Sequence, residues 1–408
     1  MNMKKNIHPA FKLFNKINPF EAFSSLPSPS YVISEEALIN NAKILAEVIE
    51  ETGCKILLAQ KAFSNFNFYP LLSDYISGTE ASGLFEARLG AEEMIGKEVH
   101  VFCGAYTDND FKELLKYADH IVFNSPNQLK KFGSLAKENG KSIGLRINPQ
   151  CSTQEGHEIY DPCAAGSRLG VTRQVWNEEM DASAIALLDG LHFHTLCEQN
   201  SDALETTLKA VEEGFGDILP QMKWLNMGGG HHITREDYDI KKLKQLIKYA
   251  QNKWNLSVYL EPGEAVALNS GYLISRVLDV VKNGNINIAI LDASAACHMP
   301  DVIEMPYTPP LYMATPKEAD NNHLTNPYPY RLGGPTCLSG DIIGDYYFNE
   351  PLKIGDMLIF GDMAIYSTCK NNTFNGMALP NIYKMTVNGS FEKLTDFGYE
   401  DFKMRLGR

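Results

Sequence analysis

Residues 98–124, EVHVFCGAYTDNDFKELLKYADHIVFN, contain the repeating unit that decides the fold. A short β-like run, Val99–Gly104, is followed by Asn109–Ala118, where apolar residues recur at three- and four-residue spacing, and then by a second β-like run, His120–Asn124. Short strands that alternate with amphipathic helices are typical of a parallel sheet with helical connections. The sequence therefore predicts an α/β fold here.

The same unit recurs along the chain from about residue 30 to residue 264. The β-like runs are Lys55–Ala59, Gly78–Ser82, Val99–Gly104, His120–Asn124, Ser142–Asn148, Gly190–Thr195, Trp224–Gly230 and Ser257–Gly263. Further helix-like segments are Glu35–Glu50, Leu84–Ile95, Asn127–Glu138 and Asp237–Trp254, and one long gap holds an irregular loop at 149–167. Eight consecutive units favour a TIM-like (β/α)₈ barrel, because an open doubly wound sheet rarely needs so many.

The pattern changes after Gly263. The runs Tyr272–Val281, Asn287–Ala293, Pro329–Leu332, Met357–Phe360 and Ile382–Thr386 are β-like, and Pro and Gly are frequent between them. This pattern predicts a second, all-β domain, a small barrel or sandwich, with a long ordered loop at 299–329.

We therefore expect three parts. They are an N-terminal extension (1–25), a barrel (26–264) in which residues 30–33 pair with the second domain, and a C-terminal β domain (265–408). The extension is expected to be loosely held, because Pro9, Pro19, Pro27 and Pro29 break any long helix.

The composition excludes several classes of protein. Of 408 residues, 44% are hydrophobic and 21% charged, which is typical of a globular chain, and 37 Lys and Arg against 50 Asp and Glu give a net charge of −13. That charge repels nucleic acids and anionic membranes and suits a cationic small molecule, although in most acidic enzymes it serves solubility alone.

The eight cysteines include no Cys-x-x-Cys pair and no closely spaced Cys and His set, so we expect reduced thiols and no metal site. The sequence also lacks a long apolar run and a secretion signal, which predicts a cytoplasmic location.

Candidate chemical groups follow four of the predicted barrel strands, at the ends where barrel enzymes carry their active sites. Lys61 follows the first run, His194 ends the sixth, Gly228-Gly229-Gly230 ends the seventh and precedes a predicted helix, and Glu261 lies at the eighth. Each alone has a simpler explanation: an exposed lysine, a structural histidine, a tight turn or a helix cap. Together they describe a site for a phosphorylated aldehyde on a pyridine ring.

These residues lie in short motifs whose order is distinctive. The motifs are Ala59-Gln60-Lys61-Ala62, Gly166-Ser167-Arg168-Leu169-Gly170, His192-Phe193-His194, Met227-Gly228-Gly229-Gly230, Glu261-Pro262-Gly263-Glu264, Gly334-Pro335-Thr336-Cys337 and Gly361-Asp362-Met363-Ala364-Ile365-Tyr366. From about Leu26 to Lys384 the sequence resembles the alanine-racemase-like (fold type III) pyridoxal-phosphate-dependent decarboxylases. Within that family it looks most like the enzymes that act on carboxynorspermidine and carboxyspermidine in polyamine biosynthesis.

The resemblance implies a role for each residue toward pyridoxal 5′-phosphate. Lys61 would bind the cofactor covalently, His194 would stack on its ring, Gly228–Gly230 would bind its phosphate and Glu261 would keep its pyridine nitrogen protonated. A carboxylate beside that nitrogen favours the protonated ring, which accepts the electron pair left when CO₂ departs.

The resemblance also assigns two residues of the C-terminal domain. Tyr366 would contact the cofactor, and Cys337 would return a proton to the α-carbon. In the family this cysteine comes from the neighbouring subunit, which implies a homodimer with shared active sites.

One residue departs from the family pattern. Relatives have an arginine after Glu-Pro-Gly, where it helps to hold the phosphate, whereas this chain has Glu264. Because a carboxylate repels phosphate, we expect Glu264 to face the cationic tail of a carboxylated polyamine, whose buried charges need acidic partners. Other candidates for that role are Asp292, Asp301, Glu304 and Asp341, about half of which are expected to be ordinary loop charges.

Two alternatives stay open. The first is another amino-acid decarboxylase of this fold, acting on diaminopimelate, arginine or ornithine; the second carboxylate of diaminopimelate needs an arginine, so Glu264 argues against that substrate. The second is a catalytically silent, cofactor-binding regulatory protein, which the intact Lys61 and Cys337 disfavour. The choice between carboxynorspermidine and carboxyspermidine depends on one methylene, which the sequence does not resolve.

Overall fold

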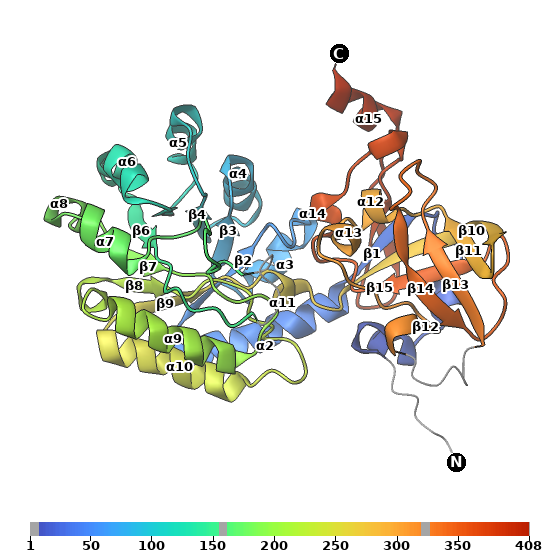
Figure 1. Cartoon of the computed structure of the whole chain (residues 1–408), viewed down its shortest axis with the longest axis horizontal. Coiled ribbons are helices and arrows are strands. Elements are labelled where there is room, and N and C mark those ends of the chain that lie inside the picture. The colour runs from blue at the N-terminus through green and yellow to red at the C-terminus, as the bar shows by residue number, and fades with distance from the viewer. Residues whose placement is uncertain (1–7, 155–160, 320–326, 408) are drawn as a thin grey trace. The chain divides into compact units, whose positions relative to one another are not determined.

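A computed structural model describes residues 8–154, 161–319 and 327–407. The chain forms two compact units, Ile39–Val266, which we call the barrel unit, and Met1–Leu38 with Ala267–Arg408, which we call the sheet unit (Figure 1). The predicted loops at 149–167 and 299–329 fall partly outside the described residues.

The barrel unit contains a closed barrel of eight parallel strands. They are β2 (Lys55–Ala59), β3 (Gly78–Ala81), β4 (Glu98–Phe102), β5 (His120–Phe123), β6 (Ser142–Arg146), β7 (Gly190–His192), β8 (Trp224–Asn226) and β9 (Ser257–Leu260). Each corresponds to one predicted run, so the (β/α)₈ prediction is confirmed. Several runs extend past their strands, because their last residues already belong to the loops that carry the candidate site.

Helices connect the strands (Figure 1). They are α2 (Glu35–Thr52), α3 (Tyr69–Ser73), α4 (Leu84–Glu93), α5 (Asp108–Leu114), α6 (Pro126–Glu138), α7 (Arg173–Glu179), α8 (Ala182–Ile185), α9 (Ser201–Phe215), α10 (Ile240–Trp254) and α11 (Glu264–Ala267). Local sequence explains their ends: Ser125 caps α6 by accepting the Gln128 N–H, and α10 stops at Asn255, whose φ of 53° is left-handed.

Trp224 is packed inside the barrel. It belongs to a buried cluster with Leu57, Val122 and Tyr259, and its indole N–H donates to Ser142 Oγ at 2.9 Å. A methyl group added at Gly190 would collide with the indole ring. The neighbouring strand therefore needs glycine here so that the ring can fill the barrel.

The sheet unit contains a nine-stranded sheet, ordered β12-β14-β13-β11-β10-β1-β16-β17, with β15 paired to β10. Its strands are β1 (Ser30–Ser34), β10 (Gly271–Asn283), β11 (Ile286–Leu291), β12 (Ala314–Pro316), β13 (Tyr328–Gly333), β14 (Ile342–Phe348), β15 (Met357–Gly361), β16 (Asn381–Met385) and β17 (Phe391–Thr395). The sheet unit also contains the short helices α12 (Ala295–His298), α13 (Asp301–Glu304), α14 (Ser367–Lys370) and α15 (Tyr399–Leu406).

For the described residues 8–25, the expectation of a loosely held N-terminal segment is wrong. A 3₁₀ helix, Pro9–Asn15, and helix α1 (Pro19–Ala22) are both present, and Phe14 packs on Tyr272 of β10 with ring centroids 4.7 Å apart. Both prolines occupy the first helical position, where proline favours a helix because no hydrogen bond is lost there. The aromatic side chains between the prolines then anchor the segment on the sheet.

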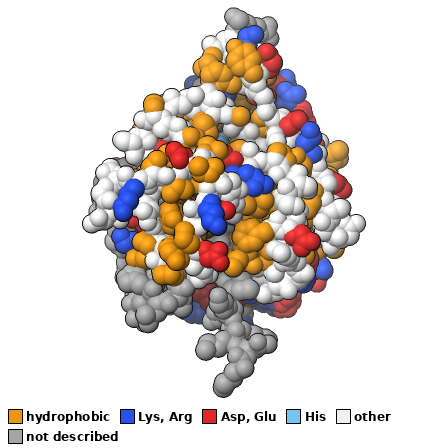
Figure 2. Space-filling view, turned by 90° about the vertical axis from the view of Figure 1, so that its right-hand side faces the viewer, with side chains coloured by type: hydrophobic (Ala, Val, Ile, Leu, Met, Phe, Trp, Pro, Cys, Tyr) orange, Lys and Arg blue, Asp and Glu red, His pale blue; other side chains and the backbone are white. Residues whose placement is uncertain are grey.

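Apolar side chains also remain on the surface of the sheet unit. Figure 2 shows them scattered among charged groups, and the β10–β11 pair carries three that are exposed, Leu278, Val281 and Ile286. Among the described residues, no helix is both long enough and apolar enough to span a bilayer.

The packing of Trp224 predicts opposite effects for two glycine substitutions. Gly190→Ala should lower the free energy of unfolding by about 1–3 kcal/mol, because the added methyl overpacks the barrel. Gly214→Ala, in α9 with open space around it, should instead raise it by about 0.5–1 kcal/mol. Urea denaturation of the two variants measures both values, and equal effects would contradict this account of the barrel interior.

Candidate active site

Polar side chains from several strand ends meet in one cavity of about 250 Å³ in the barrel unit. Lys61, His194 and Glu261, predicted from separate strands, all line it. Its other lining residues are Ala59, Glu80, Ser82, Phe102, Cys103, Gly104, Arg146, Arg168, Leu169 and His192. The barrel thus gathers three of the predicted groups at its C-terminal face.

Glu261 is held by two donors on neighbouring strands. The His192 Nε2–H donates to Oε2 at 3.0 Å and the Asn226 amide donates to Oε1 at 2.6 Å. Burial alone would raise the pKa of Glu261, but the interactions with His192 and Asn226 outweigh it and leave that pKa below its ordinary value. The carboxylate is therefore ionised and fixed in position.

His192 acts as a neutral donor. Burial lowers the pKa of its imidazole despite the adjacent carboxylate. With the proton on Nε2, the buried Nδ1 atom has no hydrogen-bond partner among the described residues. His192 therefore orients Glu261 without adding a charge to the cavity.

The three glycines form a tight connection after β8. Gly228 and Gly230 have left-handed φ angles of 68° and 78°, and a side chain at either would collide with a main-chain carbonyl, of Phe193 or Leu196. The Gly229 N–H donates to His194 Nδ1 at 3.0 Å, which fixes the ring beside the loop. Burial lowers the pKa of His194 well below its ordinary value, so this ring is neutral.

The helix predicted after the glycines, Asp237–Trp254, is present as α10. Helix α10 begins only at Ile240, after an irregular segment that contains an isolated bridge between His231 and Gln199. The prediction of a helix after the triple glycine is therefore confirmed, with its start three residues later than the sequence pattern indicates. Two main-chain N–H groups of the glycine loop already have acceptors in the structure, Asn226 Oδ1 for Gly228 and His194 Nδ1 for Gly229.

Glu264 lies at the start of α11 and turns toward a histidine. Its Oε2 is 2.8 Å from His232 Nε2, and its side chain is 15% exposed. The other ring nitrogen of His232 is buried without a hydrogen-bond partner among the described residues. The departure from the family motif thus creates a carboxylate–imidazole pair in the barrel unit.

The remaining candidates belong to the sheet unit, where Asp292 and Asp341 are hydrogen-bonded within their own unit. Asp292 accepts from Ser275 Oγ at 2.7 Å and the Arg276 N–H at 2.8 Å. The buried Asp341 accepts from Ser294 Oγ and from Thr336 Oγ1. These contacts give both carboxylates a structural role.

Three candidates surround one lysine. Lys370 of α14 contacts the carboxylates of Asp301 and, at 2.6 Å, Glu304, and its Nζ lies 5.8 Å from the centre of the Tyr366 ring. Cys337 is exposed, and its N–H donates to Asn375 Oδ1 at 2.9 Å.

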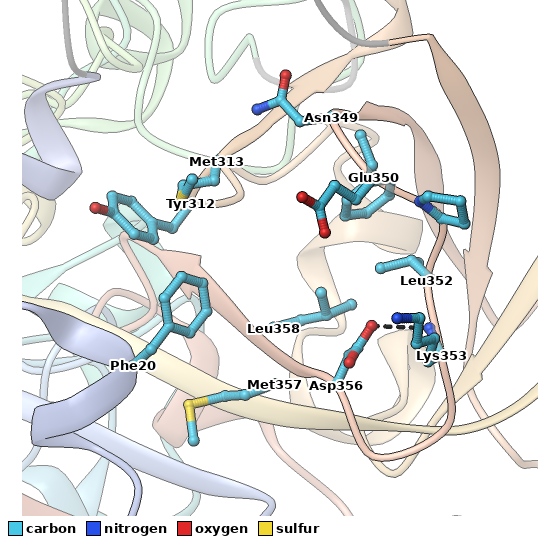
Figure 3. A pocket seen from close by; sticks show the side chains of 12 residues that line it. Phe20, Tyr312, Met313, Asn349, Glu350, Leu352, Lys353, Asp356, Met357 and Leu358 are labelled. Atoms are coloured by element: carbon cyan, nitrogen blue, oxygen red, sulfur yellow. Dashed lines mark hydrogen bonds between the residues drawn. The ribbon is translucent and has the colours of Figure 1, made fainter.

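A second cavity, of about 360 Å³, lies in the sheet unit and holds none of these groups. Figure 3 shows Phe20 of α1, Tyr312 and Leu358 around it, with Asp356 accepting the Lys353 N–H at 2.8 Å. None of the candidate residues predicted from the sequence lines this second cavity, so we assign the chemistry to the barrel cavity.

One further polar group lies at the N-terminal ends of the strands. Potential ligand atoms of Glu98, His100 and His120 lie within 4.8 Å of one another. The two imidazole rings are nearly parallel at 10°, with centroids 3.9 Å apart, and Lys55 already pairs with Glu98. Lone pairs in parallel rings do not converge on one ion, so we assign no metal to this group.

The sequence pattern alone did not single out four polar residues: Glu80, Arg146 and Arg168, which line the cavity, and Asn226, which bonds to Glu261. Three of them lie in the last two positions of β3, β6 and β8. The rule that located Lys61 and Glu261, polar residues at the C-terminal strand ends, also covers these three.

The donor set of the cavity fits pyridoxal phosphate. Lys61 supplies a primary amine for an aldehyde, and the fixed, ionised Glu261 suits a protonated ring nitrogen. Arg146 and Arg168 add positive charge that suits an anion, whereas the three glycines are not among the residues that line the cavity.

Comparisons with known proteins identify the family. Residues 30–364 match the family model described as "Pyridoxal-dependent decarboxylase, C-terminal sheet domain". A carboxynorspermidine/carboxyspermidine decarboxylase of Campylobacter jejuni is 41% identical over 94% of this chain and 99% of that protein. A carboxyaminopropylagmatine decarboxylase of Synechocystis is also 41% identical, over 94% of this chain and 96% of that protein.

The fold agrees as well. The crystal structure of the Campylobacter jejuni carboxynorspermidine decarboxylase with norspermidine matches at a TM-score of 0.84, with 39% identity, over 93% of this chain and 100% of that one. Diaminopimelate decarboxylase of Helicobacter pylori shares the fold alone, with 19% identity and a TM-score of 0.76 over 95% and 99% of the two chains. The chain therefore belongs to the pyridoxal-phosphate-dependent decarboxylases with a TIM-like barrel and a C-terminal sheet domain.

Proposed function

We propose that this chain decarboxylates carboxynorspermidine and carboxyspermidine, releasing CO₂ and norspermidine or spermidine. The observation that carries the proposal is the match, at 39% identity and a TM-score of 0.84, to an enzyme solved with norspermidine. A carboxynorspermidine/carboxyspermidine decarboxylase of Herminiimonas arsenicoxydans, 34% identical over 93% of this chain, adds support.

A second candidate substrate is carboxyaminopropylagmatine. The Synechocystis enzyme named for it is as similar to this chain as the Campylobacter jejuni enzyme is, at 41% identity. Its tail ends in a planar guanidinium instead of an ammonium, and a guanidinium is suited to bidentate pairing with a carboxylate.

The bound cofactor supplies an acceptor for the electron pair that remains on the α-carbon when CO₂ leaves. Lys61 would bind its aldehyde through the ε-amino group. Glu261, fixed by His192 and Asn226, would hold the proton on its ring nitrogen. The neutral His194, fixed by Gly229, would lie against its ring, and Gly228–Gly230 would bind its phosphate.

We propose that Cys337 donates the proton that replaces CO₂, and that it acts in the site of a second copy of the chain. Cys337 is exposed, and its main-chain N–H donates to Asn375. Leu338, directly after Cys337, and Phe374, directly before Asn375, carry apolar side chains that are also exposed, at 43% and 46%. Exposed apolar groups around a reactive thiol suit a subunit interface. Tyr366 of the same unit would contact the cofactor.

For the cationic tail we propose carboxylates at two places. Glu264 contacts an imidazole through Oε2, so its second oxygen, Oε1, would be the one that accepts from an ammonium. Asp301 and Glu304 share the single cation Lys370, so the trio keeps an excess of negative charge. Asp292 and Asp341 would contribute by holding main chain in place.

We also infer that the protein works in the cytoplasm. All eight cysteines, which lie within the described residues, are free thiols. Unpaired thiols are expected in a reducing compartment.

The substrate assignment predicts an order of turnover. CO₂ release, compared at equal enzyme and saturating cofactor, should give kcat/KM values for carboxynorspermidine or carboxyspermidine at least about tenfold above that for diaminopimelate. Carboxyaminopropylagmatine is the third competitor. A higher value for diaminopimelate would reject the polyamine assignment, and a higher value for the agmatine compound would select the second candidate.

The proposed role of Glu264 predicts an effect on substrate binding. Glu264→Gln should raise KM for carboxynorspermidine by about tenfold, because one charge-assisted hydrogen bond is lost, with kcat changed far less. Glu36→Gln, a surface substitution in the sheet unit, is the control and should change neither value. An unchanged KM in Glu264→Gln would remove this residue from the tail site.

The shared-site proposal predicts complementation between inactive variants. Lys61→Ala and Cys337→Ala should each be nearly inactive, while Cys151→Ala should resemble the wild type. When the two inactive chains are mixed by unfolding and refolding, half of randomly formed dimers are mixed, and one of their two sites is intact, so about a quarter of wild-type activity should return. If each chain builds its own site, mixing restores no activity.

A further inference from the structure

Two buried carboxylates face the same cavity from different strands. Glu80 on β3 and Glu261 after β9 both line it, and each residue is 5% exposed. Both oxygens of Glu261 accept hydrogen bonds, as described above. The carboxyl group of Glu80 has no hydrogen-bond partner among the described residues, although it is buried and borders the cavity. A buried polar group without a partner is costly unless a ligand supplies one.

The charges that face Glu80 come from four other elements. Lys61 after β2 and Arg146 on β6 favour the ionised form, whereas Glu261 and Glu86 of α4 oppose it. Arg146 is committed elsewhere: its guanidinium donates to the His194 carbonyl at 3.0 Å and lies 4.6 Å from the centre of the Phe102 ring. The ionised form of Glu80 thus has no direct partner.

The two carboxyl groups are consequently pushed in opposite directions. Burial, followed by repulsion from Glu261, raises the pKa of Glu80 well above its ordinary value, while the pKa of Glu261 is lowered. When environments separate the pKa values of two neighbouring acids, one serves as the proton carrier and the other as the ionised partner. The hydrogen-bond geometry and the surrounding charges both indicate that Glu80 is the protonated acid and Glu261 the ionised partner.

We propose that Glu80 is a further functional residue of this decarboxylase, a carboxylic acid that donates its O–H to an anionic oxygen of the bound cofactor or substrate. A neutral acid can enter a cavity that receives anions, whereas a second carboxylate beside Glu261 would repel them. The proposal rests on the decarboxylase family and its cofactor, and it does not depend on which polyamine is the substrate.

The protonation state can be tested directly in the holoenzyme by infrared spectroscopy. At neutral pH the wild type should show the carbonyl stretch of a protonated carboxylic acid that is absent from Glu80→Gln and present in Glu86→Gln. That band should disappear as the pH is raised, if the fold is retained. A wild-type spectrum without this band at neutral pH would overturn the proposal, and this measurement is independent of any substrate.

The hydrogen bond can be tested by comparing Glu80→Gln with Glu80→Ala. Glutamine keeps a neutral hydrogen-bond donor on a side chain of the same length, so the affinity of Glu80→Gln for the ligand that carries the acceptor should stay within about threefold of the wild-type value. Alanine removes the donor, so Glu80→Ala should bind that ligand about 10- to 100-fold more weakly. The control Glu86→Gln should bind as the wild type does. Equal losses in the glutamine and alanine variants, or no loss in either, would overturn the proposal.

Two binding measurements separate the possible acceptors. If the acceptor is on the cofactor, the dissociation constant of pyridoxal phosphate should rise in Glu80→Ala. If it is the substrate carboxylate, cofactor affinity should stay unchanged and KM for carboxynorspermidine should rise, while inhibition by norspermidine, which has no carboxylate, should not change. Failure of the polyamine assignment would show only in the substrate ranking and would leave the infrared and cofactor results intact.

Discussion

Pairing between the first and last strands of the barrel is the constraint on which the site depends. Lys55 and Ile56 of β2 pair with Tyr259 and Leu260 of β9, and this closes the sheet. Because the strands are parallel and neighbouring, the residues that follow them emerge at the same end. Lys61 and Glu261, 200 positions apart in the sequence, therefore line one cavity. An open sheet would leave these two residues at opposite edges.

The polar groups within the cavity are distinguished by their partners and not by their residue types. Two histidines and two glutamates lie close together, yet His192 donates to a carboxylate and His194 accepts from a main-chain N–H. Glu261 has two donors, and Glu80 has none among the described residues. Burial penalises every charge here, so the number of donors decides which acid is ionised. Placement and partners together give each group a single role.

Strand ends were predictable from sequence because two signals coincide there, an apolar run and the polar residue after it. Lys61, His194 and Glu261 were found in this way. The same two signals do not identify Glu80 and Arg146, because these residues lie inside the predicted β-like runs and not after them. The N-terminal segment differs from its prediction because proline breaks a helix only in its interior, whereas Pro9 occupies the first position of one. Contacts such as Ser294 with Asp341, 47 residues apart, leave no local pattern at all.

The acids proposed for the cationic tail illustrate the same limit. In sequence, no local pattern separates Asp292, Asp301, Glu304 and Asp341 by the partners of their carboxylates. Their contacts divide them: two accept hydrogen bonds from main chain and hydroxyl groups, and two share Lys370. An acid bonded to the chain's own N–H groups must give up those bonds to bind an ammonium, at a cost of about 1–3 kcal/mol for each buried group left unpaired. Acids that share one cation keep unused acceptor capacity, so a polycationic substrate would pair with these first.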